Sequence, residues 1–452
     1  MTVPPVLTGL PLVGLAPRML RDPLGVIADA HTLGPVVRLD MGRLPAYHVV
    51  IPPEGVLEVL AHGQRRRFEA MTVLLGDGLA ISPTGEVWRR HRRLMQPMFS
   101  HRRIAELHPL IVAASEAHID GPWRAAAATG EPLDASLALR RLTLDIIMRT
   151  MLGARLPGSA EALGANLGAV LDFMKRRLLS PLKLPLAWPL PSHRRFQRAN
   201  TALRSLSAQI LRERRERPES SATSTDLIGL MLAARDQETG EDLGDGQITD
   251  EIMTIVLAGH ETTATALVWT LLLLARHPHA LARVRTEVDA VLGARSPAVA
   301  DLAGLGYTRG ALFESMRLYP PVWAMFREFN EPRRVCGVDL PANMPIIVCP
   351  WMTHRLPAQW PDPGRFEPER FAPGAGSERP RHAYFPFGAG PHLCIGSEFA
   401  VHEALVVLAQ IVQRFDYTVV GEVPPAPRVV FTLTPRAPVR IHLRSRAGAA
   451  LA

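Results

Sequence analysis

One cysteine lies where a reactive or metal-binding sulfur would be expected. The stretch "FPFGAGPHLCIGSEFA", residues 385–400, places Cys394 in a glycine-rich loop that runs into an apolar helical pattern. Free N–H groups and the positive end of the helix dipole at a helix N-terminus favour a thiolate over a thiol. Gly388, Gly390 and Gly396 let the backbone bend and let a flat, bulky group approach without a clash with Cβ. These features favour a metal ligand at Cys394 over a nucleophile.

Two other assignments compete for this cysteine. His392, two residues earlier, is the candidate base that would make Cys394 a nucleophile. A lone cysteine is also commonly a buried structural residue. That role does not explain why Phe387, several glycines and a basic residue share the same ten positions. Cys336 and Cys349 form no paired motif with it, so neither a disulfide framework nor a cysteine-rich zinc site is indicated.

A polar cluster interrupts a long apolar segment at residues 250–276. The spacing predicts a helix of roughly 40 Å at ~1.5 Å per residue. His260 and Glu261 argue against a membrane span and for a helix buried in the protein core. An isolated buried carboxylate is costly. Glu261 beside Thr262 and Thr263 therefore indicates either chemistry or a threonine-rich helix with one hydrogen-bonded acid.

The elements that must position these residues are predicted to be mostly helical. Strand-like segments are few: residues 34–41, 46–51, 333–350 and 428–443. The last two are interpreted as hairpins that turn at residues 341–343 and 435–438. The expected fold is mainly α with a small β lobe, as one domain over residues 1–452. We expect the β lobe at about residues 30–70, with the C-terminal hairpins added to it.

Composition indicates an ordinary globular protein, with 47% hydrophobic and 21% charged residues. The formal net charge of +8 suggests an acidic partner or an anionic ligand, but no nucleic-acid-binding motif accompanies it. Residues 1–17 carry four prolines and no basic n-region, so neither a signal peptide nor a membrane anchor is expected. We expect a cytoplasmic protein, and nothing demands more than a monomer.

Residues 387–396, "FGAGPHLCIG", resemble the heme-binding loop of the cytochrome P450 family, whose pattern is Phe-x-x-Gly-x-x-x-Cys-x-Gly. In that family a cysteine thiolate is the axial heme ligand, and the resemblance assigns this role to Cys394. It implies that Phe387 packs near the sulfur and tunes it, and that Gly388 belongs to the heme-binding loop. His392 stands where the family often has arginine, which implies a pH-sensitive contact with a heme propionate.

The cluster "AGHETT", residues 258–263, resembles the family's oxygen-activation motif. The resemblance implies that Glu261 is the acid and Thr262 the alcohol of a pair that relays protons during oxygen activation. Ala258 and Gly259 would leave room for dioxygen and substrate. The heme would then lie between this long central helix and the cysteine loop.

Basic residues elsewhere match the family's contacts with the heme propionates. Residues 85–100 contain its Trp-x-x-x-Arg pattern at Trp88 and Arg92. Arg327 falls where the family often places a further propionate-binding arginine, for which a guanidinium is well suited. His91, within the Trp-x-x-x-Arg segment, is ambiguous.

The pair Glu314 and Arg317, spaced i and i+3 on one helix, would by itself be a surface ion pair in most proteins. The resemblance adds Arg370, from "FEPERF", and implies a buried network of these three residues. Such a network would be needed for heme incorporation and would take no part in catalysis.

The implied function is heme-thiolate monooxygenation with heme b as cofactor. No dinucleotide fingerprint is present, so electrons are expected from a ferredoxin and its reductase. A basic face that includes Arg89, Arg93 or Arg102 would dock the ferredoxin. A peroxide-driven peroxygenase and a non-catalytic heme sensor are the alternatives. The first would need no acid–alcohol pair, and the second would normally carry a regulatory module.

Apolar segments are candidates to line a substrate pocket: residues 71–81, 170–179 and 322–326, and Leu257. Any one of them could instead be core. With few polar anchors among them, a hydrophobic substrate is expected. Residues 187–196 and "RLYPPVWAMFRE" resemble bacterial family members that oxidise terpenes. A terpene is therefore placed before a polyketide, a steroid or a fatty acid.

Overall fold

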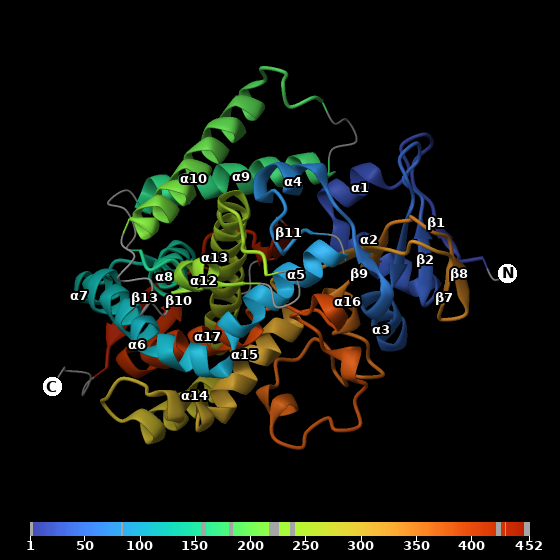
Figure 1. The fold of residues 1–452 in the computed structure, drawn as a ribbon. Helices are drawn as coiled ribbons and strands as arrows, with labels where there is room; N and C mark the ends of the chain where they lie inside the picture. The colour runs from blue at the N-terminus through green and yellow to red at the C-terminus, as the bar shows by residue number, and fades with distance from the viewer. Residues whose placement is uncertain are drawn as a thin grey trace.

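The computed structural model describes residues 3–82, 85–154, 160–179, 184–216, 226–235, 240–421, 426–429 and 431–446. Helices form most of the molecule, and the sheet-rich part lies at one side of it (Figure 1). The predicted class, mainly α with a small β lobe, is confirmed.

The helices of the described part are α1 (Ala16–Arg21), α2 (Pro23–Leu33), α3 (Pro53–His62), α4 (Glu69–Leu75), α5 (Glu86–Met95), α6 (His101–His118), α7 (Arg124–Thr129), α8 (Ala135–Met151), α9 (Ala160–Leu179), α10 (Pro191–Arg215), α12 (Leu227–Ala233), α13 (Asp245–Arg276), α14 (Pro278–Leu292), α15 (Gly306–Leu318), α16 (Pro350–Thr353) and α17 (Ser397–Arg414). Two short 3-10 helices also matter for the site: η4 (Pro368–Phe371) and η6 (Gly390–His392).

The main sheet has six strands in the order β1 (Val6–Leu7), β2 (Val36–Leu39), β3 (Tyr47–Val50), β9 (Ile346–Val348), β6 (Met325–Glu328) and β4 (Gln64–Arg65). β1 pairs with β2 and β3 with β9 in parallel, and the other pairs are antiparallel. Two of the strands come from residues 325–348, so the sheet joins the N-terminal segment to a distant part of the chain.

Both faces of this sheet are buried. On β2, Val36 packs into one hydrophobic cluster and Val37 into another, and Val50 and Val49 of β3 divide in the same way. Successive side chains of a strand point to opposite faces. This explains why each strand contains two adjacent valines, although Arg38 of β2 is exposed.

The predicted hairpin turn at residues 341–343 is wrong. β7 (Arg333–Val335) pairs with β8 (Val338–Leu340), and the turn between them is Cys336–Gly337, with φ of +46° and +80°. Residues 341–343 instead lead from β8 to β9, which joins the main sheet. Proline and asparagine indicate that the chain changes direction. They do not indicate which strand the following segment will pair with.

The predicted turn at residues 435–438 is wrong for the same reason. β11 (Pro427–Val429) pairs with β12 (Leu433–Pro435), so that hairpin closes before the proline pair. Residues 435–438 then carry the chain to β13 (Arg440–Ser445). β13 lies between β10 (Phe415–Val419) and β5 (Leu133–Asp134) in a separate sheet.

Helix α13 runs through the middle of the helical body (Figure 1) and begins at Asp245, earlier than the predicted residue 250. Within the part of the chain that the structure describes, it is the one helix long and apolar enough to cross a membrane. However, 78% of its apolar window is buried inside the protein. α13 is therefore a core helix, as predicted, and α8, α10, α15 and α17 pack around it.

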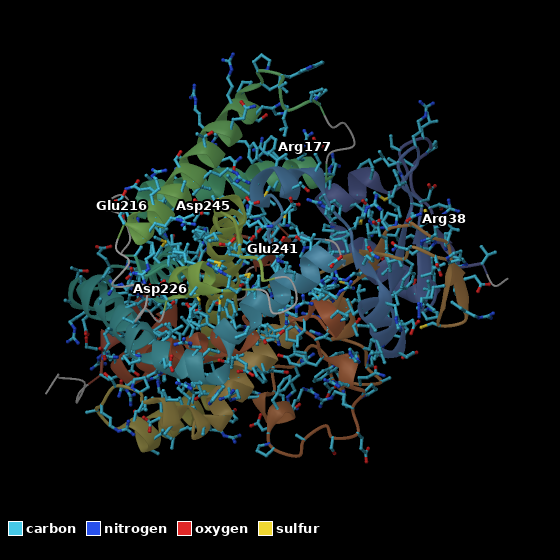
Figure 2. The ribbon with its side chains drawn as sticks, viewed as in Figure 1. Arg38, Arg177, Glu216, Asp226, Glu241 and Asp245 are labelled. Atoms are coloured by element: carbon cyan, nitrogen blue, oxygen red, sulfur yellow. The ribbon has the colours of Figure 1, made fainter. Side chains whose placement is uncertain are left out.

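Ion pairs fasten α10 to the elements beside α13. Arg214 Nη2 lies 2.6 Å from Oδ2 of Asp226, and Arg215 pairs with Asp245 at the start of α13. Figure 2 labels both acids on the side of the molecule where α10, α12 and α13 meet. Asp226 also caps α12 by accepting a hydrogen bond from the backbone N–H of Gly229.

The Glu314–Arg317–Arg370 network is present. Arg317 Nε and Nη2 donate to the two carboxylate oxygens of Glu314 at 2.7 and 2.8 Å, and both side chains are fully buried. The remaining N–H groups of Arg317 donate to the carbonyl oxygens of His354, Pro363 and Arg365. Arg370 Nε, from η4, lies 3.5 Å from Glu314. The network therefore fastens α15 to the segment that leads into the cysteine loop.

We predict that Glu314→Gln lowers the free energy of unfolding by about 3 kcal/mol, because it leaves the buried guanidinium of Arg317 without its counter-charge. Urea unfolding measures this loss. The matched control is Glu106→Gln, which removes an exposed partner of Arg102 and Arg103 and is expected to change little. Equal effects of the two substitutions would contradict the assigned role of the network.

Candidate active site

A cavity of about 450 Å³ lies between α13 and the loop that carries Cys394. Its walls come from α13, α17, the cysteine loop, residues 65–81 and residues 321–327. They are mainly apolar: Met71, Leu79, Ala80, Ile81, Met95, Phe99, Ile147, Met151, Leu312, Met316, Val322, Ala324, Met325, Phe326 and Phe399.

Cys394 lines this cavity, three residues before α17 begins at Ser397. Its backbone N–H donates to the carbonyl oxygen of Phe387 at 2.9 Å, which closes the loop. The accessible surface of its side chain faces the cavity, while protein surrounds it on the other sides. Burial raises the pKa of the thiol and outweighs the lowering by the Gly396 N–H, Arg65 and Arg92. The predicted effect of the helix end is present, as the lowering by the Gly396 N–H, but burial is the larger effect in the protein alone.

The loop glycines are needed for packing between backbones. Gly390 has φ of +67°, and a Cβ there would lie 2.3 Å from the carbonyl oxygen of Leu60 at the end of α3. Gly388 also has a positive φ, +75°, and lines the cavity. A Cβ at Gly396 would meet only a ring atom of Phe99, at 3.8 Å. Gly390 thus lets the loop backbone approach α3. The prediction from the sequence is instead that the loop glycines let a flat, bulky group approach.

Three arginines meet at one edge of the cavity: Arg65 from β4, Arg92 from α5 and Arg327 from β6. They donate to the carbonyl oxygens of Leu79, Leu393 and Phe326 at 2.6, 2.8 and 2.9 Å. None forms an ion pair with a carboxylate of the described residues. Burial lowers the pKa of Arg65 to about 10, and burial with repulsion from Arg65 lowers that of Arg327 to about 9.

Sequence reasoning missed Arg65. It stands in a two-residue strand directly opposite Arg327, and this pairing joins positions 262 residues apart. No local motif marks it. The one signal in the sequence is a run of three arginines, Arg65 to Arg67, just before an apolar segment.

His392, from η6, lies beside Trp88, with ring centroids 4.4 Å apart. Burial lowers the pKa of His392 to about 3, and the positive charges of Arg65, Arg327 and Arg92 contribute to this. This lowering favours the neutral imidazole, and the pH-sensitive contact with a heme propionate stays a prediction. Trp88 is buried, and its indole Nε1–H has no hydrogen-bond acceptor in the described part of the chain.

The predicted acid and alcohol of α13 lie on different faces of the helix. Thr262 lines the cavity together with Ala258 and Gly259, and its hydroxyl donates to the carbonyl oxygen of Ala258 at 2.8 Å. Glu261 points away from the cavity. It accepts a hydrogen bond from Thr432 at 3.3 Å, and its Oε2 lies 4.0 Å from Nε of Arg140. Adjacent residues of an α-helix differ by about 100° in direction. The cavity faces Ala258, Gly259, Thr262 and Thr263, and Glu261 falls outside that sector.

Glu251 is a second buried acid of α13 that sequence reasoning did not select. Its Oε1 accepts a hydrogen bond from the Leu79 N–H at 2.8 Å and lies 3.4 Å from Nδ1 of His91 on α5. Burial raises the pKa of Glu251. Arg65 donates a hydrogen bond to the carbonyl oxygen of the same Leu79. Both backbone groups of this cavity-lining residue are therefore hydrogen-bonded. His91, whose role the sequence leaves open, therefore lies against α13.

Two of the predicted pocket segments line the cavity and two do not. Residues 71–81 contribute Met71 and Leu79 to Ile81, and residues 322–326 also contribute. Leu257 belongs to the large hydrophobic core, and Phe173 of the 170–179 segment stacks on Phe196 of α10 with ring centroids 4.2 Å apart. For Leu257 and Phe173 the prediction is wrong, because helical periodicity marks a buried face without showing what covers it. The side chains of residues 175, 178 and 179 lie outside the described ones.

A family model for cytochrome P450 matches residues 4–441. The chain belongs to the cytochrome P450 family. It is accordingly a heme-thiolate monooxygenase, an enzyme that takes electrons from a redox partner and oxidises a hydrophobic substrate.

Curated relatives from Streptomyces extend over nearly the whole P450. Cyclooctat-9-en-7-ol 5-monooxygenase of Streptomyces melanosporofaciens is 35% identical over 90% of this chain and 87% of its own length. Cyclooctatin synthase of the same organism is 34% identical over 94% and 92%. Pentalenene oxygenase of Streptomyces avermitilis is 30% identical over 97% and 96%.

The residues of this P450 fit a heme. The cavity presents one thiol, apolar walls and, at one edge, three guanidinium groups without carboxylate partners in the described chain. A buried indole N–H without an acceptor lies next to that edge. A flat apolar ring that carries a metal and two carboxylates supplies what each of these groups lacks.

We predict that Arg65→Gln accelerates heme loss by about tenfold or more, because a hydrogen bond to a charged group contributes roughly 1.5–3 kcal/mol. Transfer of heme to apomyoglobin measures the rate. Arg67→Gln is the control, since Arg67 is more exposed and pairs with Asp77. Unchanged heme loss in Arg65→Gln would show that Arg65 does not hold the cofactor.

Proposed function

We propose that this P450 hydroxylates or epoxidises a terpene. The observation that carries the proposal is the cavity wall above the cysteine, which is almost wholly apolar and would select an apolar substrate by shape and burial. The relatives' names support it, since they designate enzymes that act on cyclooctat-9-en-7-ol and pentalenene. A polyketide, a steroid and a fatty acid are the less favoured candidate substrates.

We assign the site as follows. Cys394 would supply the thiolate ligand to the iron of heme b. Arg92, Arg327 and Trp88 bind its propionates, and Arg65 joins them. His392 is neutral and offers one N–H to the same edge. The loop residues Phe387 and Gly388 lie at the cavity beside the sulfur.

The bound heme supplies the activation of dioxygen, which places one oxygen atom in the substrate and one in water. Thr262 holds a proton at Oγ1 inside the cavity. Glu261 takes up protons on the opposite face of α13, where Arg140 and Thr432 contact its carboxylate. A change of side-chain rotamer at Glu261 would pass the proton toward the threonine.

The redox partner is proposed to be a ferredoxin with its reductase. Arg89 and Arg93 on α5 are exposed, whereas Arg102 on α6 is partly offset by Glu106. An acidic ferredoxin would dock on the first two. We further propose that the enzyme is one domain, a monomer and cytoplasmic.

We predict that the reduced, carbon monoxide-bound protein shows a strongly red-shifted Soret band that Cys394→Ala abolishes, because only a thiolate ligand produces that shift. Absorption spectroscopy of both proteins measures it. Cys349→Ala, at a buried cysteine outside the cavity, is the control. A band that survived Cys394→Ala would remove this residue from the heme.

We predict that Thr262→Ala and Glu261→Gln lower product formation roughly 100-fold with ferredoxin and NADPH, because each removes one member of a general-acid relay. Oxygen consumption and hydrogen peroxide release are measured together, and peroxide release should rise. Thr249→Ala, in the exposed first turn of α13, is the control. Full activity of both variants with hydrogen peroxide would locate their defect in proton delivery. No product from the wild type with ferredoxin and NADPH, together with turnover with hydrogen peroxide, would instead favour the peroxygenase.

A further inference from the structure

A second, smaller pocket of about 70 Å³ lies on the other face of α13. It opens to solvent between α8, α13 and the β11–β12 hairpin. Thr265 follows Glu261 by one turn of the helix and lines this pocket, whereas Thr262 lines the heme cavity. The two sites are therefore separated by the helix itself.

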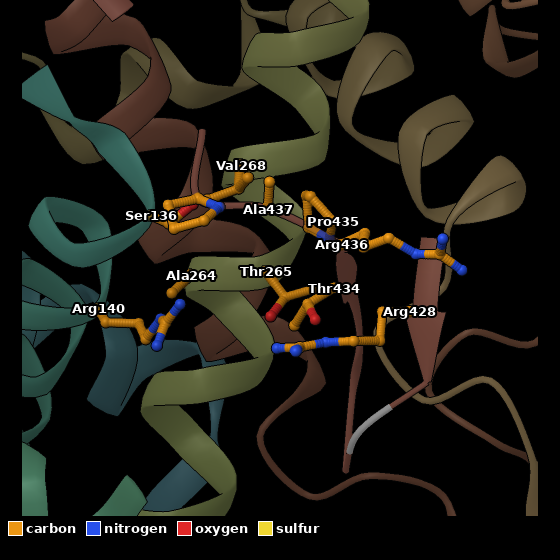
Figure 3. Close-up of a pocket in the computed structure, with 11 residues that line it drawn as sticks. Ser136, Arg140, Ala264, Thr265, Val268, Arg428, Thr434, Pro435, Arg436 and Ala437 are labelled. Carbon is orange, nitrogen blue, oxygen red and sulfur yellow. The ribbon is translucent and has the colours of Figure 1, made fainter. Parts of the chain in front are cut away.

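The pocket collects positive charge. Arg140, Arg428 and Arg436 line it, and no acidic side chain of the described residues does. Figure 3 shows the guanidinium groups of Arg140 and Arg428 pointing toward one another from opposite sides of α13, while that of Arg436 extends away. Thr265 and Thr434 lie beside the side chain of Arg428.

These donors lack acceptors in the described chain. Arg428 and Arg436 form no ion pair with any described residue, and the acid nearest to Arg140 is Glu261, at the 4.0 Å limit of an ion pair. The hydroxyl of Thr434 is buried without a hydrogen-bond partner. Two like charges that face one space repel each other, and an oxyanion between them would relieve the repulsion and accept from both.

We propose that this pocket binds a phosphate group, held by Arg140 and Arg428 with Thr434 as a further donor. Its size suits a single tetrahedral oxyanion, and its open side admits either free phosphate or the phosphate of a monoester. The two sources offer the same chemistry to the arginines.

Phosphate in this pocket would also compete for Arg140, which otherwise lies beside the Glu261 carboxylate. Glu261 would then turn more freely toward the cavity. This second part rests on the proposed monooxygenase function, since it gives Glu261 the role of proton carrier. Occupation of the pocket would raise the share of electrons recovered in product.

The test of binding is isothermal calorimetry on the heme-loaded enzyme, with sodium phosphate and with glycerol 3-phosphate at constant ionic strength in chloride. One site is expected, and Arg428→Gln and Thr434→Val should each weaken it, the first by tenfold or more. Arg444→Gln removes the same charge from exposed β13 outside the pocket and should leave binding unchanged. Binding of the monoester alone would assign the source of the phosphate.

No heat of binding with either compound would overturn the proposal, and so would an equal loss in Arg444→Gln and Arg428→Gln, because net charge alone would explain it. The heme spectrum of each variant shows that it is folded. Coupling is measured separately, as product per NADPH with and without phosphate. Binding with unchanged coupling would retain the site and refute its link to Glu261. Absence of turnover with terpenes would count against the proposed function and leave the binding result intact.

Discussion

The uncompensated positive charge at one edge of the main cavity is the constraint on which the rest of the site depends. Arg65, Arg92 and Arg327 are brought together by two strands and a helix, yet donate only to carbonyl oxygens within the described chain. Burying like charges without a counter-charge is unfavourable. The pKa values of about 10 for Arg65 and about 9 for Arg327 express this cost. An anionic cofactor stabilises the arrangement, so cofactor binding and folding of this edge are coupled.

The same edge controls the neighbouring histidine and cysteine. The arginines add to burial in keeping His392 neutral, and they oppose burial at Cys394 by favouring its thiolate. A bound metal would favour the thiolate far more strongly than the helix end does. The electrostatic character of the site thus belongs to the protein and heme together.

Helix α13 separates two tasks by its geometry. Its cavity face carries small residues and Thr262, and its other face carries Glu261 and Thr265 beside arginines. Glu251, about two turns before Ala258, accepts a hydrogen bond from the Leu79 N–H and so holds this cavity-lining residue in place. One rigid helix therefore sets the distances among cavity cover, alcohol and acid. The Glu314–Arg317 pair helps to position the cysteine loop, because it holds the segment that precedes the loop against α15.

The sequence by itself determined the family, the central helix, the cysteine loop and the Glu314–Arg317–Arg370 network. The helix, the loop and the Glu314–Arg317 pair depend on spacings of a few residues within single elements, which sequence displays directly. Arg370 lies on η4 and was added to the network by the resemblance to the family. Tertiary structure alone decided the partners of the strands, the arrival of Arg65 opposite Arg327, and the contact of Glu251 with Leu79. It also decided the direction of the pKa shifts at Cys394 and His392. Each of these depends on burial and on contacts between distant segments, because the free energy of a charge or a strand edge is set by what packs against it and not by its neighbours in the chain.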